Sequence, residues 1–223
     1  ALFIAQGLES QLVDTLKRCI TLLEQPNLPE AEITANRALK NTCLLYLSSL
    51  AQHEGLVVQQ FDCADNMTDS LAALNCSAKN NLICFGEQMQ KFEQQWHGVA
   101  LVMDKWFALG ASQNSDTIFD KLNELANHQE FSLKNPNRAR ALLGAFAMNN
   151  PAYFHCKTGR GYQFLAQNIA KLNEINPQVA SRLLTPLIQF KSFAKANQCL
   201  MKTELVKLQT LPKLSKDLQE KLT

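Results

Sequence analysis

The chain has 223 residues, 46% of them apolar, with 22 lysines and arginines against 20 aspartates and glutamates. A chain of this length buries about 70% of its unfolded surface, so it can form a core without disulfides or metals. The near balance of charge gives no electrostatic attraction to nucleic acid or to an anionic membrane. No stretch approaches the length of uninterrupted apolar residues that a bilayer span needs. We therefore expect no nucleic acid and no membrane among the partners.

Seven cysteines lie at wide, irregular intervals, and none belongs to a C-x-x-C pair. An odd number with such spacing is not typical of a disulfide framework. We interpret them as reduced thiols in a reducing compartment, which predicts a cytoplasmic protein. Residues 1–11 lack the features of a signal peptide and already follow a helical apolar pattern. We expect the chain to be a fragment of something longer.

The first half of the chain has the apolar spacing of helices. Four helices are expected, at residues 8–25, 29–55, 65–74 and 79–110. Asp65 or Asn66 caps the third. Gly55 and Gly110 end the second and fourth, as glycine often does just past a helix. The run Gly55–Phe61 has the β-branched composition of a strand, but it is too short and isolated to predict a sheet.

The second half is predicted to be helical to its end. Ser115 caps a helix whose apolar residues recur at every third or fourth position. Three Asn-Pro dipeptides follow, starting at Asn135, Asn150 and Asn176. Asparagine is a preferred N-cap, and proline is favoured at the first helical position because its missing N–H costs nothing there. Pro186 lies within the apolar stripe of the last of these helices and is expected to kink it.

One nine-residue pattern occurs twice, as NPNRARALL from Asn135 and as NPQVASRLL from Asn176. The two prolines lie 41 positions apart. A period near 40 that is built on helix starts is typical of stacked helical-hairpin repeats. We therefore predict an all-α fold, an α-α superhelix of antiparallel helix pairs of HEAT or armadillo type, as a single domain at residues 1–223. Such architectures usually present a surface rather than self-contained chemistry.

Patterns for catalysis or metal binding are weak. The H-E-x-x-H zinc signature needs two histidines on one helical face. His53 and Glu54 match its first two positions, but position 57, where the second histidine belongs, is a valine. The aspartates at 62, 65 and 69 lack the glycine and terminal glutamate of a calcium loop, so helix capping explains them better. His155 and Cys156 are neighbours that point apart, which favours a structural or exposed role over a catalytic pair. We predict no catalytic residue and no metal ligand in this chain.

Arg138, Arg140 and Arg182 lie in the first turns of the two repeated helices. The helix dipole favours acids there and disfavours cations. Such local conflicts concentrate at functional sites, and the planar fork of arginine suits a carboxylate partner. The structural alternative is a salt bridge to a neighbouring helix, and the residues alone favour that alternative.

Several distinctive strings occur along the chain in a fixed order. They are DNMTDSLAAL (65–74), GVALVMDKWF (98–107), NPNRARALLGAFAMNNPAYFH (135–155), GYQFL (161–165) and NPQVASRLLTPL (176–187). Together they resemble the C-terminal domain of bacterial aminopeptidase N, a family of zinc-dependent, alanine-preferring aminopeptidases of the gluzincin class. The resemblance runs from about Glu32 to the C-terminus.

The resemblance implies that the parent enzyme removes N-terminal residues from peptides. The family's zinc signature and its G-A-M-E-N loop, which holds the free amine of the substrate, are both absent from this chain. The Zn²⁺ would therefore belong to a catalytic domain outside the chain, no cofactor is expected within it, and the chain alone should be inactive. Thr223 would lie at or near the C-terminus of the parent.

The resemblance also implies partners and site residues. In the family, the helical domain packs against the catalytic domain of its own chain and closes a cavity that admits short peptides. Two arginines of the family face that cavity, and by motif position they match Arg140 and Arg182. These two are the predicted substrate-binding residues, whereas Arg138 has no such support.

Two other functions are compatible with the residues. The repeat alone also predicts a free-standing helical scaffold that binds another protein. An independent all-α enzyme is a third alternative, with no motif in its favour. An H-E-x-x-H sequence a few hundred residues upstream in the reading frame would distinguish the aminopeptidase domain from the scaffold.

Overall fold

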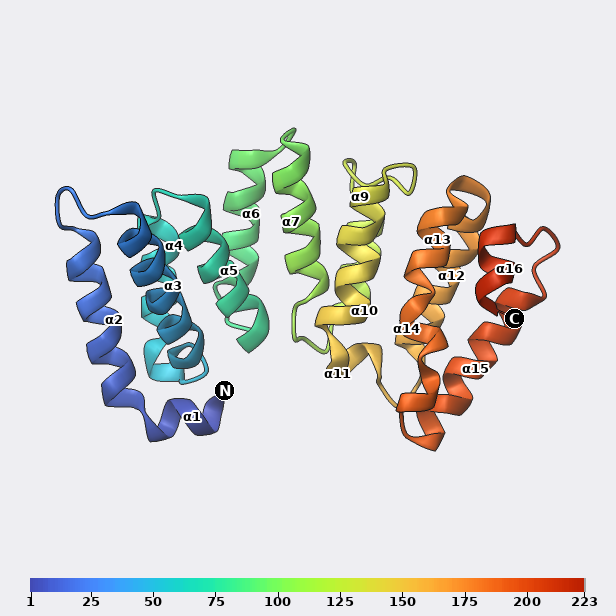
Figure 1. The fold of residues 1–223 in the computed structure, drawn as a ribbon, viewed down its shortest axis with the longest axis horizontal. Helices are drawn as coiled ribbons and strands as arrows, with labels where there is room; N and C mark the ends of the chain where they lie inside the picture. The colour runs from blue at the N-terminus through green and yellow to red at the C-terminus, as the bar shows by residue number, and fades with distance from the viewer. Residues whose placement is uncertain (223) are drawn as a thin grey trace. The chain divides into compact units, whose positions relative to one another are not determined.

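The computed structural model describes residues 1–222, and every regular element in that range is helical (Figure 1). The all-α prediction is confirmed. Contacts divide the chain into two compact units, one ending at Phe92 and the other beginning at Glu93. We predicted that residues 1–223 form one superhelical domain. Whether the two units join into one domain stays a prediction. No helix within residues 1–222 is both long and apolar enough to cross a membrane.

The first unit is built from short and medium helices joined by tight turns. They are α1 (Leu2–Gly7), α2 (Glu9–Leu23), α3 (Glu30–Leu47), the 3-10 turn η1 (Ala51–His53), α4 (Glu54–Cys63) and α5 (Met67–Asn80), and the boundary to the second unit falls within α6 (Phe85–Trp96). Helix α2 packs on α3, and α5 packs on both α3 and α4. Leu16, Leu44 and Val57 are among the buried residues that join three of these helices into one core.

The predicted cap at Asn66 is confirmed, because its side-chain oxygen accepts a hydrogen bond from the backbone N–H of Asp69 at 3.0 Å. The predicted end of the second helix at Gly55 is wrong. Helix α3 ends at Leu47, where the hydroxyls of Ser48 and Ser49 donate to nearby backbone carbonyls and compete with the helical ladder. Gly55 is instead the second residue of α4, which contains the whole strand-like run Gly55–Phe61.

The long helix expected at 79–110 is also wrong, because the chain turns twice within it. Asn81 has a left-handed backbone (φ 49°) and ends α5. Gly98 (φ 81°) then separates α6 from α7 (Ala100–Ala111), and positive φ is readily adopted by glycine. The apolar spacing continues across both turns because the helices on either side each bury a face, so periodicity alone does not reveal the breaks.

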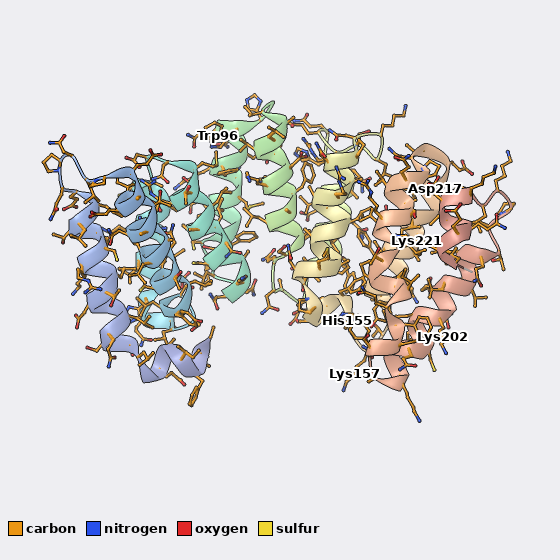
Figure 2. The ribbon with its side chains drawn as sticks, in the orientation of Figure 1. Trp96, His155, Lys157, Lys202, Asp217 and Lys221 are labelled. Carbon is orange, nitrogen blue, oxygen red and sulfur yellow. The ribbon has the colours of Figure 1, made fainter. Side chains whose placement is uncertain are left out.

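The second unit holds the remaining helices, several of them very short. They are α7, α8 (Ile118–Ala126), α9 (Pro136–Ala139), the π-helical turn η2 (Arg140–Gly144), α10 (Ala145–Asn149), α11 (Pro151–Phe154), α12 (Arg160–Ile175), α13 (Pro177–Leu183), α14 (Thr185–Ile188), the 3-10 turn η3 (Phe190–Ser192), α15 (Lys195–Gln209) and α16 (Lys216–Leu222). Helix α12 packs on α13 and α15, and α13 also packs on η2 and α16. Lys221, labelled on α16 in Figure 2, donates to the carbonyl of Ser181 at 3.0 Å.

The three predicted helix starts at Asn-Pro dipeptides are confirmed, although the asparagine side chain caps only two of them. The side-chain oxygens of Asn135 and Asn176 accept hydrogen bonds from backbone N–H groups of the first turn, with proline at the first helical position. Asn150 also precedes a proline-initiated helix, but its side chain donates to the carbonyls of Ala111 and Gln113. The predicted cap at Ser115 is wrong: the N-cap of α8 is Thr117, and Ser115 instead accepts from the N–H of Thr117 at 3.3 Å in the turn before the helix.

The two repeated helices leave α geometry in different ways. In the first copy, α9 passes into the π-helical turn η2 and continues as α10. In the second copy, α13 ends at Leu183 and α14 begins at Thr185, because Pro186 has no N–H to continue the ladder. The predicted interruption at Pro186 is confirmed. Both departures lie beside the groove described next.

Candidate functional site

Arg138 is a structural residue. It is only 3% exposed, and its Nε donates to Oδ1 of Asp104 on α7 at 2.6 Å. Its Nη1 donates to the backbone carbonyl of Glu130, and its guanidinium carbon lies 4.6 Å from the centre of the Phe107 ring. Arg138 therefore forms a salt bridge to a neighbouring helix, which was the structural alternative to a functional role.

Arg140 is exposed and has a local partner. It is the first residue of the π-helical turn, and its Nη2 donates to the side-chain oxygen of Asn137 one turn earlier. It does not line the groove that contains Arg182. A guanidinium held by one neutral amide keeps most of its donors available to a ligand.

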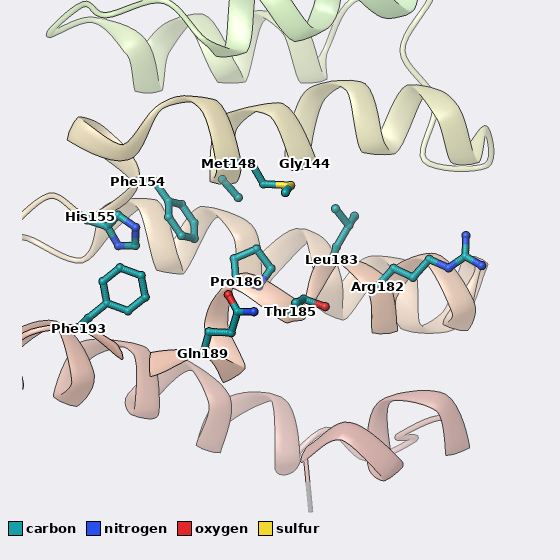
Figure 3. A pocket seen from close by; sticks show the side chains of 11 residues that line it. Gly144, Met148, Phe154, His155, Arg182, Leu183, Thr185, Pro186, Gln189 and Phe193 are labelled. Carbon is teal, nitrogen blue, oxygen red and sulfur yellow. The ribbon is translucent and has the colours of Figure 1, made fainter. Parts of the chain in front are cut away.

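Arg182 lies at one end of a groove of about 460 Å³ in the second unit (Figure 3). The side chain is exposed, and within residues 1–222 its guanidinium has no hydrogen bond or ion pair. Figure 3 shows the guanidinium extending away from Leu183 and Pro186, so the aliphatic stem borders the groove and the charge lies beyond it. The lining consists of Gly144, Ala147, Met148, Phe154, His155, Arg182, Leu183, Thr185, Pro186, Gln189 and Phe193.

His155 and Phe193 lie at the other end of the groove (Figure 3). Their ring centres are 4.4 Å apart, with the planes tilted by 32°, and Nδ1 of His155 is 2.8 Å from the hydroxyl of Tyr162. Burial lowers the pKa of His155 below its ordinary value of 6.5, so the ring is neutral at neutral pH. The groove thus has an aromatic, uncharged end and a cationic end, with apolar side chains between them.

This arrangement supports binding rather than bond-making chemistry. An apolar groove with few polar groups at its ends positions a ligand by shape, and one cation fixes its direction. The free donors of Arg182 suit an anionic or carbonyl oxygen. Met148 is 75% exposed beside the groove, and its flexible side chain can adapt to different apolar groups.

No group of three or more His, Cys, Asp or Glu side chains among residues 1–222 is placed to hold a metal ion. Of the three aspartates considered for calcium, Asp69 instead accepts hydrogen bonds from Lys40, Asn41 and Asn66. The histidine-cysteine neighbours also separate, since His155 lines the groove whereas Cys156 contacts the hydroxyl of Thr158.

Sequence reasoning proposed Arg182 as a substrate-binding residue, which stays a prediction, and it missed the groove beside Arg182. The lining comes from segments up to 49 positions apart, between Gly144 and Phe193, and no local pattern joins them. Pro186 was the one usable signal, because a proline inside an apolar stripe indicates a break, and breaks leave space between helices.

Residues 2–223 match a family of domains described as "Domain of unknown function (DUF3458_C) ARM repeats". The chain is 44% identical over 196 residues to Aminopeptidase N of Escherichia coli K12, covering 87% of this chain and 22% of that protein. It is 45% identical over 188 residues to Aminopeptidase N of Haemophilus influenzae, covering 84% of this chain and 22% of that protein.

A solved structure has the same fold. Legionella pneumophila aminopeptidase A, in complex with aspartic acid, superposes with a TM-score of 0.87 at 25% identity, over 98% of this chain and 26% of that one. The chain thus spans 22% of the length of the two curated relatives just described.

Proposed function

This chain belongs to the DUF3458_C family of ARM-repeat domains and matches the C-terminal domain of aminopeptidase N, and from that premise we propose that it lines the peptide-binding cavity of a parent aminopeptidase. In this proposal it packs against the catalytic domain of its own polypeptide and contacts short peptides whose N-terminal residues the parent removes. The relatives are aminopeptidases much longer than this chain, which favours this function over a free-standing scaffold.

Arg182 carries the proposal. Its guanidinium is exposed, has no partner within residues 1–222, and lies just beyond one end of an apolar groove. A short peptide offers a matching set of groups, namely backbone carbonyls, apolar side chains and a terminal carboxylate. Arg182 would donate to the carboxylate or to a carbonyl, and charge-assisted bonds of this kind are about twice as strong as neutral ones.

The family implies zinc, and the donors of this chain do not fit a zinc site. Within residues 1–222 no three potential ligands converge, and a zinc site needs at least three protein ligands. We assign the metal and the hydrolytic step to the part of the parent outside this chain. Arg140 and Arg182 would bind and orient the substrate. The seven cysteines are all free thiols, which supports a reducing compartment such as the cytoplasm.

The test is Arg182→Ala in the full-length parent enzyme. We expect kcat/KM for dipeptides and tripeptides to fall by about ten- to a hundredfold, since a charge-assisted hydrogen bond contributes about 1.5–3 kcal/mol. An alanyl-anilide, which has no C-terminal carboxylate, should lose far less. Steady-state kinetics on both substrate types give the comparison.

Arg182→Lys is the matched control. It keeps the positive charge but not the planar fork, so it should restore part of the peptide activity. If Arg182→Ala lowers peptide and anilide turnover equally, Arg182 supports the structure and does not contact the carboxylate.

A further inference from the structure

A second groove, of about 490 Å³, lies wholly within the first unit. It is bordered by α2, α3 and α4 and by the turn between α4 and α5. Its volume falls in the range of small-molecule sites. Leu16, Leu44 and Leu56 supply apolar wall, and Ile20, which is 40% exposed, adds apolar surface to it.

One wall of this groove carries three charged side chains. Lys40 and Asp69 are almost fully buried, at 8% and 6% exposure, and Nζ of Lys40 donates to Oδ2 of Asp69 at 2.7 Å. Arg37 lies beside them, one helical turn before Lys40 on α3, with a side chain that is 30% exposed. Two cations therefore face one carboxylate on this wall.

Asp69 has little capacity left for Arg37. Its Oδ2 accepts from Lys40 and from Asn66 (3.0 Å), and its Oδ1 accepts from Asn41 (2.9 Å). Burial raises the pKa of Asp69, but the hydrogen bonds from Lys40, Asn66 and Asn41 lower it by more, so the carboxylate stays ionised. Its charge is already compensated by Lys40.

Arg37 is left without a hydrogen-bonding acceptor. Its Nε lies 3.6 Å from Oδ2 of Asp69, which is an ion pair but not a hydrogen bond. That Nε is buried and has no hydrogen-bond partner within residues 1–222. The side chain of Arg37 lines the groove, and the paired donors of a guanidinium have the geometry that fits a carboxylate.

The rim limits the charge of the ligand. Glu24 and Asp65 line the open side of the groove and are exposed. Two negative charges there repel an anionic ligand, and they repel a dianion such as inorganic phosphate more strongly than a monoanion. A single carboxylate on an aliphatic body can place its charge at Arg37 and its apolar part against the leucines of the lining.

We propose that this groove binds a small aliphatic monocarboxylate, with Arg37 as the residue that anchors the carboxylate and the leucines of α2, α3 and α4 as the apolar wall. The site is separate from the Arg182 groove and uses none of its residues. Its ligand class follows from an arginine whose Nε has no hydrogen-bond acceptor, an apolar wall and an acidic rim.

The experiment is isothermal titration of the whole chain with N-acetyl-leucine, and with N-acetyl-leucinamide as its uncharged analogue. We expect N-acetyl-leucine to bind at least about tenfold more tightly than the amide, since one charge-assisted contact distinguishes them. Inorganic phosphate should not displace it. Arg37→Gln should weaken N-acetyl-leucine by about tenfold or more and leave the binding of the amide unchanged.

Arg18→Gln, an exposed arginine on α2 that does not line the groove, is the matched control and should bind like the wild type. Circular dichroism shows whether each variant is folded, and Arg37→Lys gives a second test because it keeps the charge but loses the fork. Undetectable binding by the wild type, equal binding of acid and amide, or full binding by a folded Arg37 variant would each overturn the proposal.

Discussion

The three arginines of the repeated pattern have three different environments. Arg138 is buried between a carboxylate, a carbonyl and an aromatic ring. Arg140 is exposed and contacts one neutral amide, and Arg182 is exposed beside a groove. A cation near a helix start indicates a partner outside the helix, but the sequence does not say whether that partner is another helix or a ligand.

At this scale we predict that Arg138→Ala destabilises the fold by about 3–5 kcal/mol, because it leaves Asp104 partly buried without its partner. The matched variant Arg140→Ala should change the free energy of unfolding by less than about 0.5 kcal/mol, as exposed substitutions usually do. Urea denaturation of the two variants gives both values. Similar values for both would show that the Arg138–Asp104 pair contributes little.

Individual elements depend on a few close contacts. Gly161 is the second residue of α12, and a Cβ added there would lie 2.3 Å from the backbone carbonyl oxygen of Phe154 in α11. Only a residue without a Cβ lets the start of α12 approach the backbone of α11 so closely. Gly55, at the same position in α4, has nothing within 4 Å of an added Cβ.

We therefore predict opposite effects for two identical substitutions. Gly161→Ala should destabilise the protein by about 1–3 kcal/mol, because backbone must move to relieve the overlap. Gly55→Ala should be neutral or stabilising by up to about 1 kcal/mol, because alanine favours a helix where space is free. Thermal unfolding followed by circular dichroism measures both, and destabilisation by Gly55→Ala would contradict the explanation.

Helix starts marked by an asparagine cap were predictable from the sequence, whereas other starts and many helix ends were not. The Asn-Pro dipeptides and Asn66 act through groups that adjoin in sequence, so their pattern is sufficient. The break at Gly98 was missed because apolar residues keep helical spacing on both sides of it. The π-helical turn at Arg140–Gly144 was also missed, because no residue type in it breaks the apolar spacing of a helix.

At the scale of the whole molecule, each unit has its own buried core. Repeat proteins are stabilised by neighbouring contacts, so their segments can unfold in separate steps. Both tryptophans, Trp96 and Trp106, follow Glu93 and therefore belong to the second unit. Tryptophan fluorescence thus reports on that unit alone, whereas circular dichroism reports on all helices.

We predict that urea unfolding followed by these two probes gives different midpoints. The fluorescence transition should describe the second unit only, and the circular dichroism transition should be broader because it adds the first. Coincident transitions would show that the chain unfolds as one cooperative block.

The family and the fold class could be predicted from strings and spacing, and the comparisons confirmed both. The candidate site could be predicted only in part. Arg182 came from its place in a recognisable pattern, but the groove beside it depends on distant segments. Arg37 was missed altogether, because its importance lies in what Asp69 already binds and not in any motif.

The doubled pattern has a final consequence for symmetry. Its shared positions are equivalent, since Ala139, Leu142 and Leu143 are buried like their counterparts one repeat later. The arginines are not equivalent, because Arg140 lies four positions after its proline and Arg182 five after its own. One step along an α-helix turns a side chain by about 100°. The two copies therefore match at their core positions only. Arg140 and Arg182 occupy non-equivalent positions on their helices.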